Sequence, residues 1–385
     1  MTLLDRAVFP RDKVCGDVLL PDAQQTLAKL GLDSAALQAG SYACTGVSYV
    51  PSNGATLAGV FADAGGERRP WWMVRRRELD AWLLREAEQA GTAIMVGISA
   101  ETLLRTPTGA VEGVACRAAD GRTFGIRAKV VVGADGASST VAREVGAFSR
   151  LPAHTCIAAR AYVEGLSLPD PYLEVYTTRS TLPGCAWIAP VGPTSANVGI
   201  GIVLSTANRS GVTPQALFQK VRRDSPLLAD RLKNAGELRL RGWTLPAATE
   251  GRAMAGPGWL LVGDAAALVD PFTGHGIQNA LMSGVMAGEA ISTYLADHSC
   301  NAAHLVAYEQ RCRTALADEI RTGSFLQRLH SNSALMRVVT CSCAGHRGLR
   351  DTFIALVGHA APRRSLLSVR ALIAASFGRR GRVAA

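Results

Sequence analysis

Two apolar strands, each ending in glycine and aspartate, constrain the fold of this chain most strongly. Residues 130–132 are three valines that run straight into Gly133, Ala134 and Asp135, and residues 259–262 run into Gly263 and Asp264. Short apolar runs that end in turn residues are typical of strands buried in a parallel sheet. A helical pattern follows each strand. The sequence therefore predicts an α/β fold that binds ligands at the carboxyl ends of these two strands.

The rest of the chain alternates between helical and strand patterns. Amphipathic helices are predicted at 22–30 and 77–90, each stopped by a glycine, and longer ones at 214–232 and 276–295. The chain after residue 302 is predicted to be helix or loop. Strand patterns lie at 43–73, 93–96, 111–117, 123–128 and through most of 151–248. Because these stretches alternate, two domains interleaved along the chain are expected.

Composition narrows the class of protein. Of the 385 residues 48% are apolar, yet no run reaches the roughly eighteen apolar residues of a membrane span. An acid and a base follow two leucines at the start, which argues against a secretory signal and favours a cytoplasmic location. Nine cysteines without a Cys-x-x-Cys pair fit a reducing compartment and no structural zinc.

The charge balance is basic, with 41 lysines and arginines against 31 acids and a net charge of +10. Such a surplus can attract anionic cofactors, acidic lipid or nucleic acid. The arginines are mostly scattered and lack the interleaved aromatic residues of a nucleic-acid module. No nucleic-acid partner is therefore expected.

The turn after the second apolar strand carries the strongest functional signal. Gly274 and Gly276 flank His275 at the start of a predicted helix, so free backbone amides and the positive end of the helix dipole would face a ligand. This arrangement suits an anion. Aspartates such as Asp135 and Asp264 can accept hydrogen bonds from sugar or ribitol hydroxyls. The alternative is ordinary turn and helix-capping chemistry, with His275 as a packing residue.

Several segments, in order, resemble the geranylgeranyl reductase family. That family belongs to the FAD oxidoreductases with the p-hydroxybenzoate hydroxylase fold. The segments that carry the resemblance are residues 4–6, 9–17, 76–83, 133–136 and 263–280. Residues 183–190 and 197–201 are similar to the family's substrate-pocket motif.

The resemblance implies a Rossmann-like FAD domain interleaved with a β-sheet substrate domain, followed by C-terminal helices. The FAD domain would comprise residues 1–40, 76–150 and 250–300, and the substrate domain residues 41–75 and 151–249. Residues 301–385 would form the C-terminal helical region.

The resemblance also assigns roles to individual residues. FAD contacts are expected from Asp5 on the adenosine ribose, Arg76, Asp135, Gly136, Gly263, Asp264, Gly274, Gly276 and Ile277. His275 and Cys15 are the catalytic candidates, with the Cys15 thiol placed to assist proton delivery to a substrate carbon. For Cys15 the alternative is a small residue that packs a tight turn.

Two substrate-pocket residues, Trp187 and Cys185, are assigned in the same way. The family pattern has an aromatic residue where this chain has Cys185, and a phenylalanine where it has Ala189. A roomier pocket is therefore expected, which suits a substrate bulkier than a linear prenyl chain. The alternative for Trp187 is simple packing on the sheet.

The Gly-x-Gly-x-x-Gly loop that cradles the FAD diphosphate in this family does not occur in the sequence. By the resemblance, the chain starts just before the acid Asp5 of the second strand. The expectation is a chain truncated ahead of that unit, or a start assigned too far downstream.

The favoured function is an FAD-dependent reductase that saturates carbon–carbon double bonds of an apolar isoprenoid or lipid-like substrate, with NAD(P)H or ferredoxin as electron donor. The alternatives are a flavin monooxygenase or halogenase of the same fold, or a non-catalytic truncated remnant. The tail at 363–385, where Leu366, Leu367, Val369, Leu372 and Ile373 are spaced helically among arginines, is a candidate for a peripheral membrane contact. The favoured alternative is a C-terminal helix packed on the body with a solvated basic end. The oligomeric state is left open.

Overall fold

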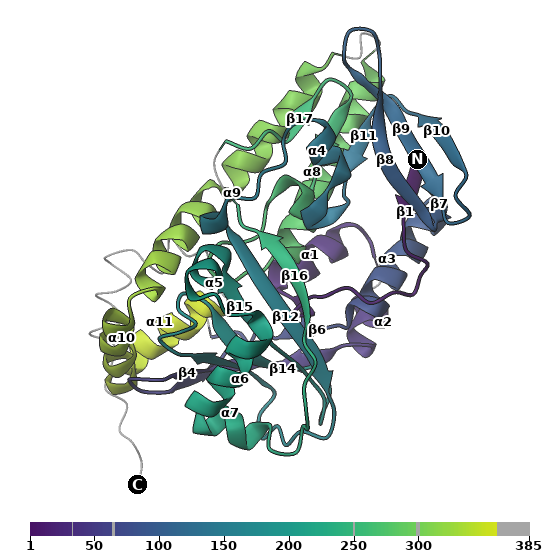
Figure 1. Cartoon of the computed structure of the whole chain (residues 1–385). Helices are drawn as coiled ribbons and strands as arrows, with labels where there is room; N and C mark the ends of the chain where they lie inside the picture. Colours follow the sequence, from purple (N-terminus) through teal and green to yellow (C-terminus); the bar gives the residue numbers. More distant parts are fainter. Residues whose placement is uncertain (33, 64–65, 249–250, 298–300, 360–385) are drawn as a thin grey trace.

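The computed structural model describes residues 1–32, 34–63, 66–248, 251–297 and 301–359 (Figure 1). The expected membrane-contact tail at 363–385, and with it the end of the expected C-terminal region, lies outside the described residues. Within the described residues, no helix has both the length and the apolar character needed to cross a membrane.

The two apolar strands form as predicted and lie side by side. β11 (Val131–Gly133) pairs in parallel with β18 (Trp259–Leu261), and β17 (Ala255–Gly256) pairs antiparallel to β18. The two glycine–aspartate turns therefore leave the same end of one sheet. The prediction that β11 is fully buried is wrong, because β11 lies at the edge of this sheet and Val132 is 38% exposed.

Two further small sheets complete this half of the molecule. β1 (Thr2–Asp5) pairs in parallel with β7 (Ala93–Val96). β9 (Val111–Ala118) lies between β10 (Thr123–Arg127) and β8 (Ile98–Arg105) in an antiparallel sheet. The sequence analysis missed β8.

The predicted helices are confirmed here with small shifts of their ends. α1 (Pro21–Lys29) and α3 (Arg76–Gln89) end before Gly31 and Gly91, which adopt left-handed backbone conformations. α8 (Ile277–Ala296) begins directly after Gly276. The short helices α2 (Ser34–Ala39) and α4 (Thr140–Glu144) and the 3-10 turns η1 (Gly136–Ser138), η2 (Pro152–His154) and η3 (Gly263–Ala266) complete the connections.

The other half of the molecule is built on a seven-stranded sheet that draws strands from two distant parts of the chain. Its order is β16 (Arg241–Pro246), β12 (Thr155–Val163), β15 (Ala196–Val203), β14 (Cys185–Pro190), β13 (Tyr172–Thr177), β4 (Gly46–Pro51) and β5 (Leu57–Val60). β13 and β4 are parallel, and the other neighbours are antiparallel. A separate small sheet consists of β2 (Val18–Leu19), β6 (Trp71–Met73) and β3 (Tyr42–Cys44), with β6 in the middle.

Helices cover the sheet and close its far end. α5 (Leu204–Ser210), α6 (Pro214–Asp224) and α7 (Pro226–Arg231) follow β15. The single helix predicted over 214–232 is wrong, because Ser225 caps a new helix that starts at Pro226. α9 (Ala303–His330) runs along the molecule from the first half to the second, where α10 (Ser333–Gly345) and α11 (Arg347–Val357) pack (Figure 1).

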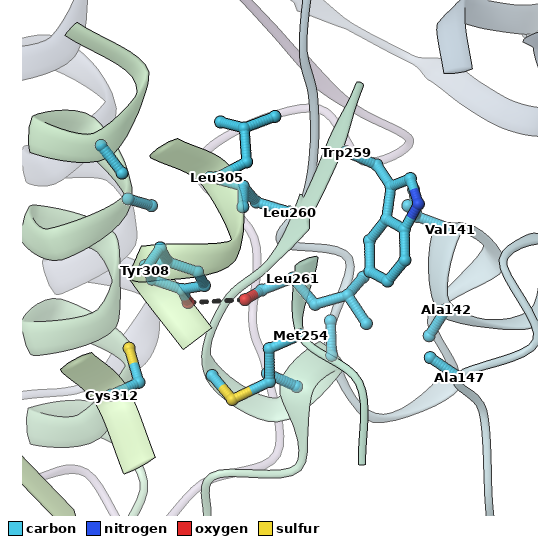
Figure 2. Close-up of a cluster of buried hydrophobic side chains, with 14 of the residues drawn as sticks. Val141, Ala142, Ala147, Met254, Trp259, Leu260, Leu261, Leu305, Tyr308 and Cys312 are labelled. Atoms are coloured by element: carbon cyan, nitrogen blue, oxygen red, sulfur yellow. Dashed lines mark hydrogen bonds between the residues drawn. The ribbon is translucent and has the colours of Figure 1, made fainter. Parts of the chain in front are cut away.

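α9 is anchored to β18 through the largest buried core. Figure 2 shows the Tyr308 hydroxyl donating a hydrogen bond of 2.6 Å to the Leu261 carbonyl, beside Leu260, Leu305 and Met254. Burial of these side chains stabilises the contact by roughly 25 cal/mol per Å² of apolar surface. This packing fixes where the C-terminal helices lie relative to the strand that ends at Gly263.

Candidate functional site

A cavity of about 1020 Å³ runs between the two halves of the molecule. Its walls are mostly apolar and come from the loop before β2, the turns after β11 and β18, one face of the seven-stranded sheet and helices α9 to α11. All of the residues predicted for the site except Asp135 line it: Asp5, Cys15, Arg76, Gly136, Cys185, Trp187, Gly263, Asp264, Gly274, His275, Gly276 and Ile277. The tertiary structure therefore brings the predicted residues together.

The start of α8 faces this cavity without a side chain over its amides. Gly276 is the residue that caps α8, and a Cβ on it would lie 3.2 Å from Oδ1 of Asp264. Gly263 and Gly274 have φ of +55° and +74°, in the left-handed region that favours glycine. The unpaired amides of the first helical turn, together with the helix dipole, can bind a negatively charged edge of a ligand.

Asp270, which the sequence analysis did not single out, holds this loop in shape. Its carboxylate accepts hydrogen bonds from the Phe272 amide at 2.9 Å and the Thr273 hydroxyl at 2.8 Å. The Asp270 amide donates to the His275 carbonyl at 2.8 Å. The loop that presents Gly274 and Gly276 is therefore fixed by one buried aspartate.

His275 lines the cavity and also packs on aromatic neighbours. Its ring meets Trp71 edge-on with 5.3 Å between centroids, and lies 5.5 Å from the His359 ring. These contacts fix the orientation of the imidazole. A packing role is thus visible for His275, and its catalytic role stays a prediction.

A chain of four charges lines the cavity near β1. Arg76 donates to Oδ1 of Asp80 at 2.7 Å, Arg11 donates to Oδ2 of Asp80 at 2.7 Å, and Arg11 also reaches Asp5 at 3.1 Å. Burial favours the neutral form of Asp80, but the two guanidinium groups outweigh it and lower its pKa. Burial opposes the charge of Arg76, but Cys15 and Asp80 beside it raise its pKa overall. Arg11 and Asp80 lie in the segments 9–17 and 76–83 that carry the resemblance, but neither was singled out as a site residue.

Asp135 acts on the backbone next to the cavity. Its carboxylate accepts hydrogen bonds from the Ser139 hydroxyl and from the amides of Thr140 at 2.6 Å and Val141 at 3.3 Å. These contacts hold the start of α4. The cofactor contact expected of Asp135 stays a prediction, while its neighbour Gly136 lines the cavity.

Small residues line part of the cavity wall that the seven-stranded sheet forms. Gly201 on β15 pairs with Ala158 on β12 and with Cys185 on β14, so the three positions form one row across the sheet. Burial raises the pKa of the Cys185 thiol to about 12, so this thiol is neutral at physiological pH. Trp187 lies over Gly199, where a Cβ would come within 2.4 Å of the indole.

Of the two positions from which a roomier pocket was expected, one lines the cavity. Cys185 lines the cavity, but Ala189 does not. Ala189 lies on the same face of β14 as Cys185 but further along the strand, where it is buried in a core cluster with Val47 and Trp71. Ala189 therefore does not contribute directly to the cavity wall.

A polar pair lies deeper in the cavity wall. Nδ1 of His330 is 2.9 Å from the Pro183 carbonyl, so it carries the hydrogen, and Nε2 then accepts from the Tyr49 hydroxyl at 2.9 Å. Burial lowers the pKa of His330 and raises that of Tyr49, so both are neutral near pH 7. These contacts join α9 to β4, and sequence reasoning missed them.

The far end of the cavity is apolar and is built by the C-terminal helices. Its lining includes Leu326 on α9, Met336 and Val339 on α10, and Phe353 and Leu356 on α11. No group of three potential metal ligands occurs in the part of the chain that the structure describes. The cavity thus joins one end with charged and glycine-rich residues to an apolar compartment.

Known proteins resemble this chain in sequence and in structure. A family described as FAD binding domain matches residues 2–321. A menaquinone reductase of Mycobacterium tuberculosis is 31% identical over 307 residues, which cover 76% of this chain and 70% of that protein. A digeranylgeranylglycerophospholipid reductase of Methanococcoides burtonii is 33% identical over 70% of this chain and 64% of its own length.

A solved structure also resembles this chain in its fold. The crystal structure of a geranylgeranyl bacteriochlorophyll reductase-like protein from Thermoplasma acidophilum matches with a TM-score of 0.78. It is 20% identical, and the match covers 97% of this chain and 88% of that one. The two chains therefore share a fold.

Proposed function

We propose that this chain, an oxidoreductase that belongs to the family of FAD binding domain proteins, reduces carbon–carbon double bonds of an apolar isoprenoid substrate. One observation carries this proposal. A single cavity connects the glycine-rich start of α8 and the charged residues near β1 with an apolar compartment formed by the sheet and by α9 to α11.

The residues at the polar end fit the flavin part of FAD. The uncapped amides of α8 suit the electron-rich edge of a flavin, and glycine at 263 and 276 lets the chain pack closely here, since a Cβ would lie 2.9 Å from Ala280 and 3.2 Å from Asp264. Gly274, Gly276 and Ile277 would hold that edge, and Asp264 the ribityl hydroxyls. Asp5 would contact the adenosine ribose. No residue of this sequence is assigned to the diphosphate, since it contains no Gly-x-Gly-x-x-Gly loop.

Bound FAD, once reduced, supplies a hydride equivalent to one carbon of the double bond. The other carbon then needs a proton, and Cys15 is the group that we assign to deliver it. The Arg76 guanidinium lies beside this thiol and would stabilise the thiolate that remains. His275 would support the loop that faces the flavin edge. The electron donor is assigned to the class of NAD(P)H or ferredoxin.

The apolar end of the cavity suits a hydrocarbon chain. Leucine, methionine, valine and phenylalanine side chains from three helices line it, so a prenyl chain would be buried away from water. The names of the two relatives, a menaquinone reductase and a digeranylgeranylglycerophospholipid reductase, support an isoprenoid or lipid substrate. Such a substrate would be met at a membrane surface.

The test uses the purified chain loaded with FAD and reduced by dithionite without oxygen. Menaquinone and a geranylgeranylated glycerophospholipid are offered separately, and the products are analysed by mass spectrometry. The proposal expects a gain of two hydrogens for each reduced carbon–carbon double bond, counted after any quinol that dithionite forms has been re-oxidised to the quinone. A product that gains oxygen, or a halogen, when air and a halide salt are added would instead favour a monooxygenase or halogenase. Unchanged substrate under both conditions would contradict the proposal.

A further inference from the structure

The turn that carries Cys15 is held to the seven-stranded sheet by one buried side chain. Asn197 lies on β15, and its Nδ2 donates hydrogen bonds to the Cys15 carbonyl at 2.7 Å and to Oδ2 of Asp17 at 2.8 Å. The exposed fractions of Asn197 and Asp17 are both 0%. Asn197 thus fixes the backbone of Cys15 from a strand that lies 182 residues further along the chain.

The same side chain also holds the cavity wall. Nε1 of Trp187 donates a hydrogen bond to Oδ1 of Asn197 at 3.1 Å. The Trp187 indole can reach Asn197 because Gly199 carries no side chain, and a Cβ there would overlap the ring. Trp187 lines the cavity, as Cys15 does.

The hydrogen-bonding groups of Asn197 leave one orientation for its amide. Trp187 Nε1 is a donor, so it must face the amide oxygen. Both hydrogens of the amide nitrogen are then used by the Cys15 carbonyl and by Asp17. Rotating the amide would set two donors against each other and two acceptors against each other. If the Trp187 indole moves, the Asn197 amide must therefore move with it or lose a hydrogen bond, and the same amide holds the Cys15 turn.

Other contacts hold the rest of this loop to the neighbouring strand β12. The Tyr162 hydroxyl donates to Oδ2 of Asp17 at 2.6 Å. Arg160 donates to Oδ1 of Asp12 at 2.6 Å and to the Lys13 carbonyl at 3.0 Å. The loop is thus held on both sides of Cys15, and Asn197 binds the backbone carbonyl of Cys15 itself.

We propose that Asn197 is a positioning residue that couples Trp187 in the cavity wall to the turn that carries Cys15. A substrate that packs on the indole would thereby also set the position of the thiol. The consequence for catalysis rests on the role that the proposed function gives to Cys15, whereas the mechanical coupling does not.

The test measures how fast iodoacetamide alkylates each cysteine of the full chain, by mass spectrometry of the peptides. Cys341 is exposed and serves as the internal reference. Asn197→Leu keeps the size of the side chain and removes its hydrogen bonds. We expect the ratio of Cys15 to Cys341 alkylation to rise by about fivefold, the effect of losing one such bond. Trp187→Phe, which removes only the Nε1 donor and part of the ring, should raise it by about twofold.

The double variant decides whether the two residues act through one another. If Trp187 acts on Cys15 through Asn197, the double variant Trp187→Phe with Asn197→Leu alkylates no faster than Asn197→Leu alone. Multiplied effects would mean that the residues act independently, and would overturn the coupling. An unchanged ratio in Asn197→Leu would overturn the positioning role.

A matched control separates positioning from general loosening. Thr213→Ala removes the hydrogen bond that caps α6 on the same half of the molecule and should leave the Cys15 ratio unchanged. Faster alkylation of the buried Cys44 and Cys312 in Asn197→Leu, to the same degree as Cys15, would contradict the proposal. Because the assay needs neither FAD nor substrate, it is independent of the reduction test: inactivity there would leave this result standing.

Discussion

Arg76 binds Asp80 through two hydrogen bonds, of 2.7 Å from Nε to Oδ1 and 2.9 Å from Nη2 to Oδ2. Arg11 adds a third bond to the same carboxylate and links it to Asp5. A buried carboxylate between two guanidinium groups holds both in place. The polar end of the cavity is therefore organised by Asp80, from one turn into α3, although Asp80 was not a predicted site residue.

Replacing Asp80 by asparagine should destabilise the fold by about 3 kcal/mol at neutral pH, because it leaves the largely buried Arg76 guanidinium without its partner and Arg11 with Asp5 alone. The pKa of Asp80 is lowered in the folded state. Its contribution is therefore present above the unfolded value of about 4 and is lost as the pH falls below it. Thermal melts should show a gap between wild type and Asp80→Asn at pH 7 that shrinks toward pH 3.

Asp120 provides the control for this variant, since it pairs with Arg122 on the surface. Asp120→Asn should leave the melting temperature unchanged, as exposed pairs contribute little. An equal effect of the two substitutions would contradict the special role of Asp80.

Asp17 should make the protein less stable as the pH rises. Burial raises its pKa, and the hydrogen bonds from Tyr162 and Asn197 and the charges of Arg160 and Arg76 only partly offset this. For an acid with a raised folded pKa, the stabilising contribution is complete below the unfolded value of about 4 and is lost as the pH rises through the folded pKa. Asp17→Asn removes this dependence.

Asparagine fits at position 17, where φ is 64°, since this residue tolerates the left-handed region. Its oxygen can take the two bonds of Oδ2. Melting temperatures of wild type and Asp17→Asn, measured from pH 4 to pH 8, should diverge in favour of the variant as the pH rises. Parallel curves would show that Asp17 does not titrate in this range.

A methyl group at Gly199 should disturb the cavity wall. The Cβ of Gly199→Ala would lie 2.4 Å from the Trp187 ring and 2.5 Å from the Ala159 carbonyl, so the indole must move. We expect a loss of about 2 kcal/mol in the free energy of unfolding and a change in Trp fluorescence. Gly284→Ala, inside α8 with open space around it, should instead stabilise by about 1 kcal/mol.

Substitutions of Asp264 and Cys15 should affect different steps, cofactor binding for Asp264 and reduction of the substrate for Cys15. Asp264→Ala removes a carboxylate at the start of α8 and should weaken FAD binding about tenfold, the effect of one charged hydrogen bond. Cys15→Ser should keep FAD occupancy and slow the reduction of substrate, because a hydroxyl is a weaker acid than a thiol. Flavin absorbance per protein gives occupancy, and stopped-flow reduction gives the rate. Equal loss of flavin in both variants would contradict this division of roles.

Much of the local structure followed from the sequence. α1, α3 and α8 are stopped or started by glycines, and β11 and β18 are short apolar runs, so their signals lie within a few residues. The predictions were wrong where contacts with distant parts of the chain decide the structure. Position 189 was expected in the cavity and lies in a core, since residues of the small β2–β6–β3 sheet pack against that end of β14.

The sequence by itself determined the two glycine–aspartate turns and the helix start that line the cavity, and which family the chain resembles. Backbone conformation and turn chemistry are local, so a few adjacent residues specify them. The tertiary structure alone decided which polar side chains complete that site.

Asn197 meets Cys15 across 182 positions, Arg11 meets Asp80 across 69, and Tyr49 meets His330 across 281. No local pattern in the sequence indicates that these residues contact each other. A buried polar group is stable only where the packed chain brings it a partner, and that partner is set by the arrangement of sheets and helices.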